Sequence, residues 1–152
     1  MPGVGQICSL ICGLWINYIA VSCPVDIIFV LDESGSVGSA NFDLMKAFVS
    51  QLVGTLDVSS TGTRIGLITY ASYVDTGADQ QFNLIDHSTV LAVQDAIAKL
   101  VYSSGGTNTA VALDYVAANM LTSAAGDRAD VPNVVIVLTD GYSGGSPEVC
   151  TS

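Results

Sequence analysis

One stretch decides the fold of this chain: Val25-Asp26-Ile27-Ile28-Phe29-Val30-Leu31, followed at once by Asp32-Glu33-Ser34-Gly35-Ser36. The first part is almost wholly apolar, which predicts a strand over 25–31 that is buried on both faces of a parallel sheet. The second part places one carboxylate and two hydroxyls at alternate positions on the loop after that strand. Open α/β sheets bind their ligands at this end of their strands. Oxygen ligands suit a hard cation such as Mg²⁺ or Mn²⁺ better than zinc. The plain alternative is a Ser/Gly turn that caps the next helix.

After this strand, patterns typical of helices and strands alternate along the chain. They predict helices over 40–56, 90–100 and 109–121, and further strands over 64–71, 81–84 and 134–138. Ser39 is expected to cap the first helix. The third helix is expected to bury Val111, Leu113, Val116, Met120 and Leu121. This order predicts an α/β domain with a doubly wound, mainly parallel sheet, helices on both faces and one antiparallel edge strand.

The length and charge of the chain limit its class. Its 152 residues fit one domain with a real core, and 50% of them are hydrophobic, which excludes a disordered acidic tail. Four Lys and Arg stand against fourteen Asp and Glu, which gives a formal net charge of −10. A basic stripe for a phosphate backbone is therefore absent, and nucleic acid is not an expected partner.

The first 22 residues differ in character from the rest. The segment 7–21 is almost wholly apolar, and Ala20 and Ser22 are small residues at the −3 and −1 positions of a cleavage after Ser22. This pattern predicts that 1–22 is a secretory signal peptide, although a basic start is missing. The apolar run is short for a membrane span, which needs roughly 20 apolar residues. An incorrectly joined start of the gene is the other alternative.

The cysteines take their meaning from that prediction. Cys8 and Cys12 would leave with the signal peptide, whereas Cys23 and Cys150 would remain near the two ends of the mature chain. In an oxidising compartment these two thiols could form a disulfide bridge. The cysteines and the single histidine do not have the spacing of a zinc site. We therefore expect a secreted domain over 24–152, with no membrane span after cleavage.

Two later segments are expected at the same edge of the sheet as Asp32. Gly105-Gly106-Thr107 precedes the third predicted helix, and Asp140 follows the last strand within Thr139-Asp140-Gly141. The first and last strands of a parallel sheet can be neighbours, and their carboxyl ends then meet at one edge. The sequence thus predicts that hydroxyls and carboxylates from three loops converge there.

The pattern D-x-S-x-S, then a Thr, then an Asp resembles the von Willebrand factor A domain with its metal-ion-dependent adhesion site. The matching positions are Asp32, Ser34, Ser36, Thr107 and Asp140. The resemblance covers residues 24–146 and looks closest to extracellular matrix members over 24–38. Full members of the family carry further β/α units after the Asp140 strand, so the chain resembles a C-terminally truncated domain. The resemblance implies that the strand 134–138 lies at an uncovered edge, which would be prone to aggregation.

The donor types at these positions agree with a cation site. The hydroxyls of Ser34 and Ser36 would bind the ion directly, and Thr107 directly or through water. Asp32 and Asp140 would bind directly or through water and would also hold the hydroxyls in place. One position would remain for water, which an Asp or Glu of a partner protein could displace. Mg²⁺ or Mn²⁺ is expected in preference to Ca²⁺.

Two titratable residues outside the matching positions are not expected to bind the cation. Glu33 lies between two of the expected ligands, and we expect it to be a solvated surface charge that points away from the ion. His87 is the only histidine and precedes a predicted helix, so we expect a surface or capping residue rather than a ligand.

Enzyme motifs fit less well. The segment 141–145 matches G-x-S-x-G after a strand, but a nucleophile elbow needs a helix next and then an acid and a histidine, whereas Pro147 follows and His87 lies upstream. An EF-hand fails because Val37 stands where glycine is required. A P-loop fails because no Gly-Lys-Ser/Thr follows Gly106. A phosphatase of the D-x-D type fails because Ser34 stands at the second aspartate.

We therefore expect a secreted, non-enzymatic module that binds Mg²⁺ or Mn²⁺ and engages an extracellular protein ligand, such as a collagen-like or other matrix protein, through an Asp or Glu. Two alternatives stay open. One is a truncated structural fragment that keeps the motif but binds nothing. The other is an intracellular domain of the same family that acts as an assembly module beside an ATPase, against which secretion and a Cys23–Cys150 bridge would count.

Overall fold

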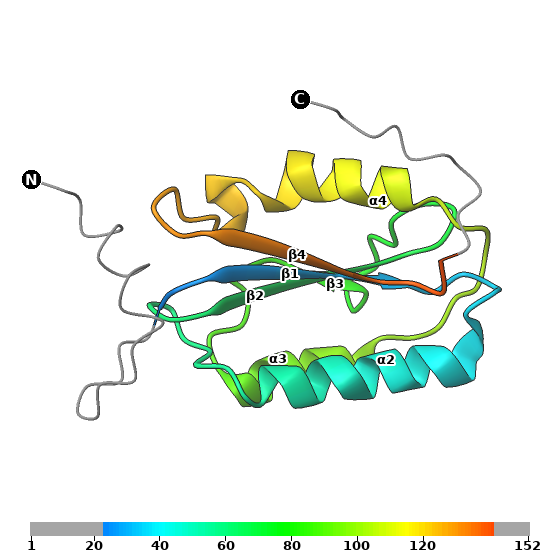
Figure 1. Cartoon of the computed structure of the whole chain (residues 1–152), viewed down its shortest axis with the longest axis horizontal. Helices are drawn as coiled ribbons and strands as arrows, with labels where there is room; N and C mark the ends of the chain where they lie inside the picture. The colour runs from blue at the N-terminus through cyan, green and yellow to red at the C-terminus, as the bar shows by residue number, and fades with distance from the viewer. Residues whose placement is uncertain (1–22, 142–152) are drawn as a thin grey trace, which may run out of the picture.

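The computed structural model describes residues 23–141 of the chain. Their elements, in chain order, are β1 (Asp26–Asp32), α2 (Gly38–Val53), β2 (Arg64–Tyr70), β3 (Gln81–Phe82), α3 (Val90–Lys99), α4 (Thr109–Tyr115), the π-helical turn η1 (Val116–Met120), the 3₁₀ turn η2 (Ser123–Ala125) and β4 (Asn133–Leu138). Figure 1 shows three layers, with α2 and α3 on one face of the sheet and α4 on the other. The predicted α/β class, with helices on both faces, is confirmed.

The sheet has the strand order β3-β2-β1-β4. β1 pairs in parallel with β2 on one side and with β4 on the other, whereas β3 pairs antiparallel with β2 at the edge. The expectations of a mainly parallel sheet, an antiparallel edge strand and neighbouring first and last strands are therefore confirmed. Because β1 has a neighbour on each side and helices on both faces, all seven of its residues are buried.

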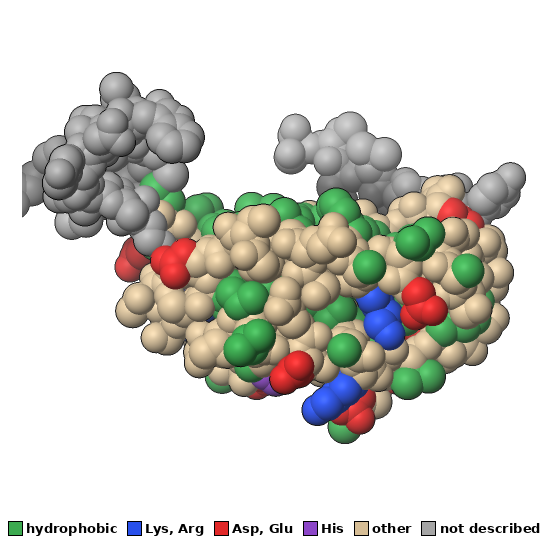
Figure 2. Space-filling model, turned by 90° about the horizontal axis from the view of Figure 1, so that it is seen from below, with side chains coloured by type: hydrophobic (Ala, Val, Ile, Leu, Met, Phe, Trp, Pro, Cys, Tyr) green, Lys and Arg blue, Asp and Glu red, His purple; other side chains and the backbone are tan. Residues whose placement is uncertain are grey.

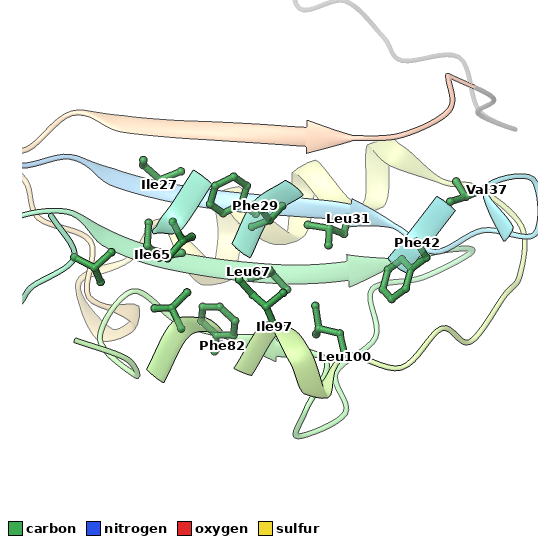
Figure 3. Packing of buried hydrophobic residues seen from close by; sticks show 14 residues of the cluster. Ile27, Phe29, Leu31, Val37, Phe42, Ile65, Leu67, Phe82, Ile97 and Leu100 are labelled. Carbon is green, nitrogen blue, oxygen red and sulfur yellow. The ribbon is translucent and has the colours of Figure 1, made fainter. Parts of the chain in front are cut away.

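The larger hydrophobic cluster fills the space between the sheet and the α2/α3 layer. Phe29 and Leu31 on β1 and Leu67 on β2 point into it, and they meet Phe42 of α2 and Ile97 of α3 (Figure 3). These helical residues carry the predicted 3.6-residue period, so this face of the fold follows directly from the apolar pattern. The packing fixes the direction of β1 and hence the place of the loop that follows it.

The second cluster lies between the sheet and α4. Ile28 and Val30 of β1 alternate with the residues that face α2 and pack against Val116 and Met120. Leu113 was expected on this buried side, but it is 41% exposed, so that prediction is wrong. The reason is a change of helical period, because the α-helix ends at Tyr115 and a π-helical turn follows.

The start of α2 also differs from the prediction. The helix begins at Gly38 with Val37 as N-cap and without a side-chain cap, so Ser39 is not the cap. Val37 is only 2% exposed, which shows that packing of the loop holds this end. The predicted cap is therefore replaced by an apolar anchor directly after the Asp32–Ser36 loop.

β4 is the edge strand opposite β3 in the described part of the sheet. Its residues Val134 and Val135 are 42% and 37% exposed, whereas the pattern of the strand is as apolar as that of β1. The expectation of an uncovered edge over 134–138 agrees with this exposure.

Along the α2/α3 face, charged side chains are few and scattered among apolar and neutral ones (Figure 2). Within residues 23–141, no helix has the length and apolar character of a membrane span.

Several predictions concern residues outside the described range. The signal peptide over 1–22, the cysteines Cys8, Cys12 and Cys150, and the G-x-S-x-G segment beyond Gly141 all lie there. Cys23 is disulfide-bonded in the structure, but its predicted pairing with Cys150 also lies outside the described residues and stays a prediction.

Candidate functional site

The loop after β1 draws three of the five predicted ligands together. Asp32 is fully buried, and its Oδ1 accepts a hydrogen bond from the Ser34 backbone N–H at 2.8 Å. The hydroxyl oxygens of Ser34 and Ser36 lie 3.1 Å apart. Ser34 is buried and Ser36 is exposed, so the pair of hydroxyls lies at the boundary between the core and solvent. The loop thus places a carboxylate, held by a backbone amide, next to two hydroxyls that contact each other at the carboxyl end of the sheet.

The loop 103–108 is held against this first loop by its backbone. The Gly35 N–H donates to the Gly105 carbonyl at 2.8 Å, and the Gly106 N–H donates to Ser72 Oγ at 3.0 Å. Gly105 needs to be glycine, because its φ is 144° and a Cβ would lie 3.0 Å from the Ala71 Cβ. Thr107 lies half-buried on this loop. The structure therefore brings the Thr107 segment to the same end of the sheet as Asp32.

The third loop begins where β4 ends. Thr139 donates its hydroxyl hydrogen bond to Asp32 Oδ2 at 2.7 Å, and the Gly141 N–H donates to Thr139 Oγ1 at 3.1 Å. Asp140 lies between these two residues and is exposed. Asp140 thus follows directly on a contact with Asp32. The contact itself belongs to Thr139, which the pattern analysis did not single out, although its hydroxyl stands next to a predicted ligand.

Tyr70 lies beneath the three loops at the end of β2. It is fully buried, and its hydroxyl lies 3.0 Å from the hydroxyl of Thr109, the first residue of α4. Desolvation by burial raises the pKa of Tyr70, and the negative charge of Asp32 raises it further. Tyr70 is therefore a neutral hydrogen-bonding group that joins the floor of the site to the helix after the Thr107 loop.

Glu33 is not the solvated charge that was expected. Its side chain is 1% exposed, and its Oε2 accepts a hydrogen bond from the Ser103 N–H at 3.3 Å. Desolvation raises the pKa of Glu33, an effect that hydrogen bonds from Ser103 partly oppose. The expectation fails because the loop 101–105, far away in sequence, closes over this carboxyl group. His87 was expected to be a surface or capping residue; it is half-buried, its ring packs edge-on against Phe82 with centroids 4.9 Å apart, and Thr89 is the residue that caps α3.

The charge around this end of the sheet is not balanced by basic side chains of the described residues. The ion pairs of the described residues join Lys46 to Asp43 on α2 and Arg128 to Asp26 at the amino end of β1. Arg64 donates to the backbone carbonyls of Ser60 and Gly126. Asp32 is thus a buried carboxylate that hydroxyl and amide donors hold, a type of site that attracts a cation from solution.

The donor set fits a hard divalent cation. Two oxygens bound at right angles to one Mg²⁺ lie about 2.9 Å apart if each bond is about 2.0–2.1 Å, and the hydroxyl oxygens of Ser34 and Ser36 are 3.1 Å apart. Within residues 23–141, no three His, Cys, Asp or Glu side chains form a group that could hold a metal ion. A cation at this end would therefore depend on the serine and threonine hydroxyls.

A shallow hollow of about 320 Å³ adjoins these loops. Its lining comes from the 71–76 segment, the 103–105 segment and Glu33. Tyr73 is 78% exposed at this hollow. The surface beside the candidate site therefore presents an exposed aromatic ring and polar groups to solvent.

Comparison with known proteins identifies the family. The model of the von Willebrand factor type A domain matches residues 26–151. The collagen alpha-4(VI) chain of Mus musculus is 41% identical over 122 residues, which are 79% of this chain and 5% of that protein. Matrilin-1 of Bos taurus is 39% identical over 121 residues, which are 78% of this chain and 22% of that protein. The chain therefore spans less than a quarter of the length of these two relatives.

A solved structure shows the same fold. It is that of proximal thread matrix protein 1 from the mussel byssus, with zinc in its metal-ion-dependent adhesion site (MIDAS) motif. The match has a TM-score of 0.73 and 27% sequence identity, and it covers 82% of this chain and 33% of that one. The names of these relatives denote a collagen chain, a matrilin and a thread matrix protein and not enzymes. On the sequence match, the strand order and the fold similarity together, the chain belongs to the von Willebrand factor type A domain family.

Proposed function

We propose that this domain is a divalent-cation-dependent protein-binding module of the extracellular matrix. The observation that carries the proposal is the contact of Asp32, Ser34 and Ser36 at the carboxyl end of β1, where a buried carboxylate is held by hydroxyl and amide donors. The zinc-occupied MIDAS motif of the mussel protein supports a divalent cation here. The proposed cation is Mg²⁺ or Mn²⁺, because every donor is an oxygen.

Each of the five residues has a proposed role. Ser34, Ser36 and Thr107 hold the cation through neutral hydroxyls, while Asp32 and Asp140 balance its charge. Two carboxylates neutralise a divalent ion without excess, so the ion keeps its attraction for a further anionic ligand. A carboxylate of the partner protein would supply that ligand. The bound cation contributes Lewis acidity for this contact, and no proton transfer or bond cleavage is needed.

The proposed partner is an extracellular protein that presents Asp or Glu, with a collagen-like or other matrix protein as the first choice. The relatives named as a collagen chain and as a thread matrix protein support this choice. The exposed ring of Tyr73 supports it as well, since exposed aromatic residues are enriched at protein interfaces.

Secretion is part of the same proposal. We propose that residues 1–22 are removed as a signal peptide and that the domain spans 24–152. The disulfide-bonded state of Cys23 agrees with an oxidising compartment. An N-terminal sequence of the protein secreted from cultured cells that starts at Cys23 would support this cleavage, and an uncleaved intracellular chain would contradict it.

Calorimetric titration of the chain with Mg²⁺ and with Mn²⁺ tests the cation site, and solid-phase binding to collagen with and without chelator tests the partner. Asp32→Ala and Thr107→Ala should each abolish cation binding and cation-dependent collagen binding. Asp79→Ala is the matched control, because Asp79 is an exposed acid outside the three loops. Collagen binding that persists in chelator, or in Asp32→Ala, would contradict the mechanism. Cation binding without any collagen binding would support the cation site but exclude collagen as the partner.

A further inference from the structure

Thr139 holds a hydroxyl group between two fixed partners. Its Oγ1 accepts a hydrogen bond from the Gly141 N–H at 3.1 Å and donates one to Asp32 Oδ2 at 2.7 Å. A hydroxyl has a single proton. Because the amide of Gly141 can only donate, the direction of that proton is fixed toward Asp32. The amide also polarises the hydroxyl, which strengthens its hydrogen bond to the carboxylate.

The other oxygen of Asp32 is held as well. Its Oδ1 accepts from the Ser34 N–H at 2.8 Å, and the side chain is fully buried. One donor thus comes from the loop after β1 and one from the end of β4. With a donor on each oxygen, the plane of the carboxylate cannot rotate without breaking a hydrogen bond. Each oxygen keeps further lone-pair capacity for a cation or a cation-bound water.

We propose that Thr139 is a positioning residue of the cation site, which acts through Asp32 and joins the end of β4 to it. The inference rests on the proposed cation binding. Thr139 orients Asp32 before the cation arrives, so the carboxylate need not reorganise when the ion binds. Partners of metal-binding groups contribute about 10–100-fold in metal affinity. The same segment constrains the backbone at the adjacent Asp140, because Gly141 and Thr139 on either side of it are hydrogen-bonded to each other.

Three variants of the full chain test this role with Mn²⁺ and Mg²⁺ alone as probes, measured by calorimetric titration. Thr139→Val removes the hydroxyl with little change in shape and should weaken cation binding about 10-fold or more. Thr139→Ser keeps the hydroxyl and should stay within about threefold of the wild type. Thr55→Val is the matched control, because the Thr55 hydroxyl bonds to the Leu52 carbonyl at the end of α2, and it should leave cation affinity unchanged.

Unfolding in chelator separates positioning from a general loss of structure. Thr139→Val removes one donor from the buried Asp32 carboxylate, so its chelator Tm should fall but its unfolding should stay cooperative, while the cation affinity of the folded chain falls. Thr139→Ala serves in its place should the valine variant not unfold cooperatively. Wild-type affinity in both hydroxyl-free variants, or a serine variant as weak as valine, would overturn the inference and leave the proposed function intact. Absence of cation binding in the wild type would overturn both.

Discussion

The two ends of β1 each carry a fully buried aspartate, but the partners of the two carboxylates differ. At the amino end, Asp26 accepts from the Arg128 Nε at 3.0 Å and from the Arg128 backbone N–H at 3.1 Å. At the carboxyl end, Asp32 accepts from the Ser34 N–H and the Thr139 hydroxyl. One carboxylate is paired with a cation of the protein itself, and the other with neutral donors.

This difference separates a structural ion pair from the proposed cation site within a single strand. Arg128 also donates to the carbonyls of Thr61 and Gly62, so the ion pair at the amino end ties three segments together. A buried carboxylate with neutral partners keeps its negative field, which a cation from solution can use. We therefore expect Asp26 to contribute to stability and Asp32 to serve the proposed cation site.

The largest expected effect is at the amino end. Arg128→Met keeps the apolar stem but leaves Asp26 buried without its cationic partner, which should lower the free energy of unfolding by about 3–5 kcal/mol. Urea denaturation in chelator measures this change. Lys99→Met is the control, since Lys99 is an exposed residue in the last turn of α3. A loss below about 1 kcal/mol would show that the ion pair is not structural.

The next effect is at the carboxyl end and needs a cation. At a Mg²⁺ or Mn²⁺ concentration 100 times the Kd, binding to the folded state should raise the free energy of unfolding by about 2.7 kcal/mol. Asp32→Ala should lose this increment, whereas Arg128→Met should keep it if it folds. Thermal unfolding of the three proteins, with each cation and with chelator, provides the measurement. Equal increments in the wild type and Asp32→Ala would place the cation elsewhere.

Glu33 should add a pH dependence at the carboxyl end. Burial raises its pKa above the ordinary 4.5, so the folded chain keeps this proton at pH values where the unfolded chain has lost it. The free energy of unfolding then falls as the pH rises from about 4.5 through the raised pKa, and the full penalty is present above it. Glu33→Gln removes this term. The stability of the variant relative to wild type should thus increase with pH over that window, and a flat difference in urea denaturation at each pH would contradict the assignment.

The smallest effect on stability should come from Ser36→Ala. Ser36 is exposed, so in chelator the free energy of unfolding should change by less than about 0.5 kcal/mol. The cation increment should nevertheless fall, because the variant lacks one proposed ligand. Ser39→Ala, on an exposed residue of α2, is the control and should change neither quantity. A full cation increment in Ser36→Ala would remove Ser36 from the ligand set.

The fold could be predicted from the sequence because local periodicity and burial agree. The continuous run over 25–31 marks a central strand, and the spacing of Phe42 and Val49 marks the helix that covers it. The exposure of the edge strand β4 could not be predicted from the apolar pattern alone. The strand over 134–138 has an equally apolar pattern, yet Val134 and Val135 are exposed because β4 has a single neighbour in the described sheet.

The site could be predicted only as far as its local motif reaches. The contacts among Asp32, Ser34 and Ser36 follow from alternate positions on one loop. Thr139 and Ser103 act on that loop across 107 and 70 residues of sequence, so their contacts with Asp32 and Glu33 depend on the tertiary fold. The burial of Glu33 was missed for this reason. A hydroxyl next to the predicted ligand Asp140 was the one local signal for Thr139.

Paramagnetic broadening by Mn²⁺ tests the difference between the two ends of β1 most directly. In amide NMR spectra of the isotope-labelled chain, substoichiometric Mn²⁺ should first broaden the signals of Ser34, Ser36, Thr107 and Asp140. Signals near Arg128 at the other end should persist, and Mg²⁺ should compete for the same site. Broadening that begins near Arg128, or that spreads evenly over exposed acidic residues, would contradict a cation site at the carboxyl end of the sheet.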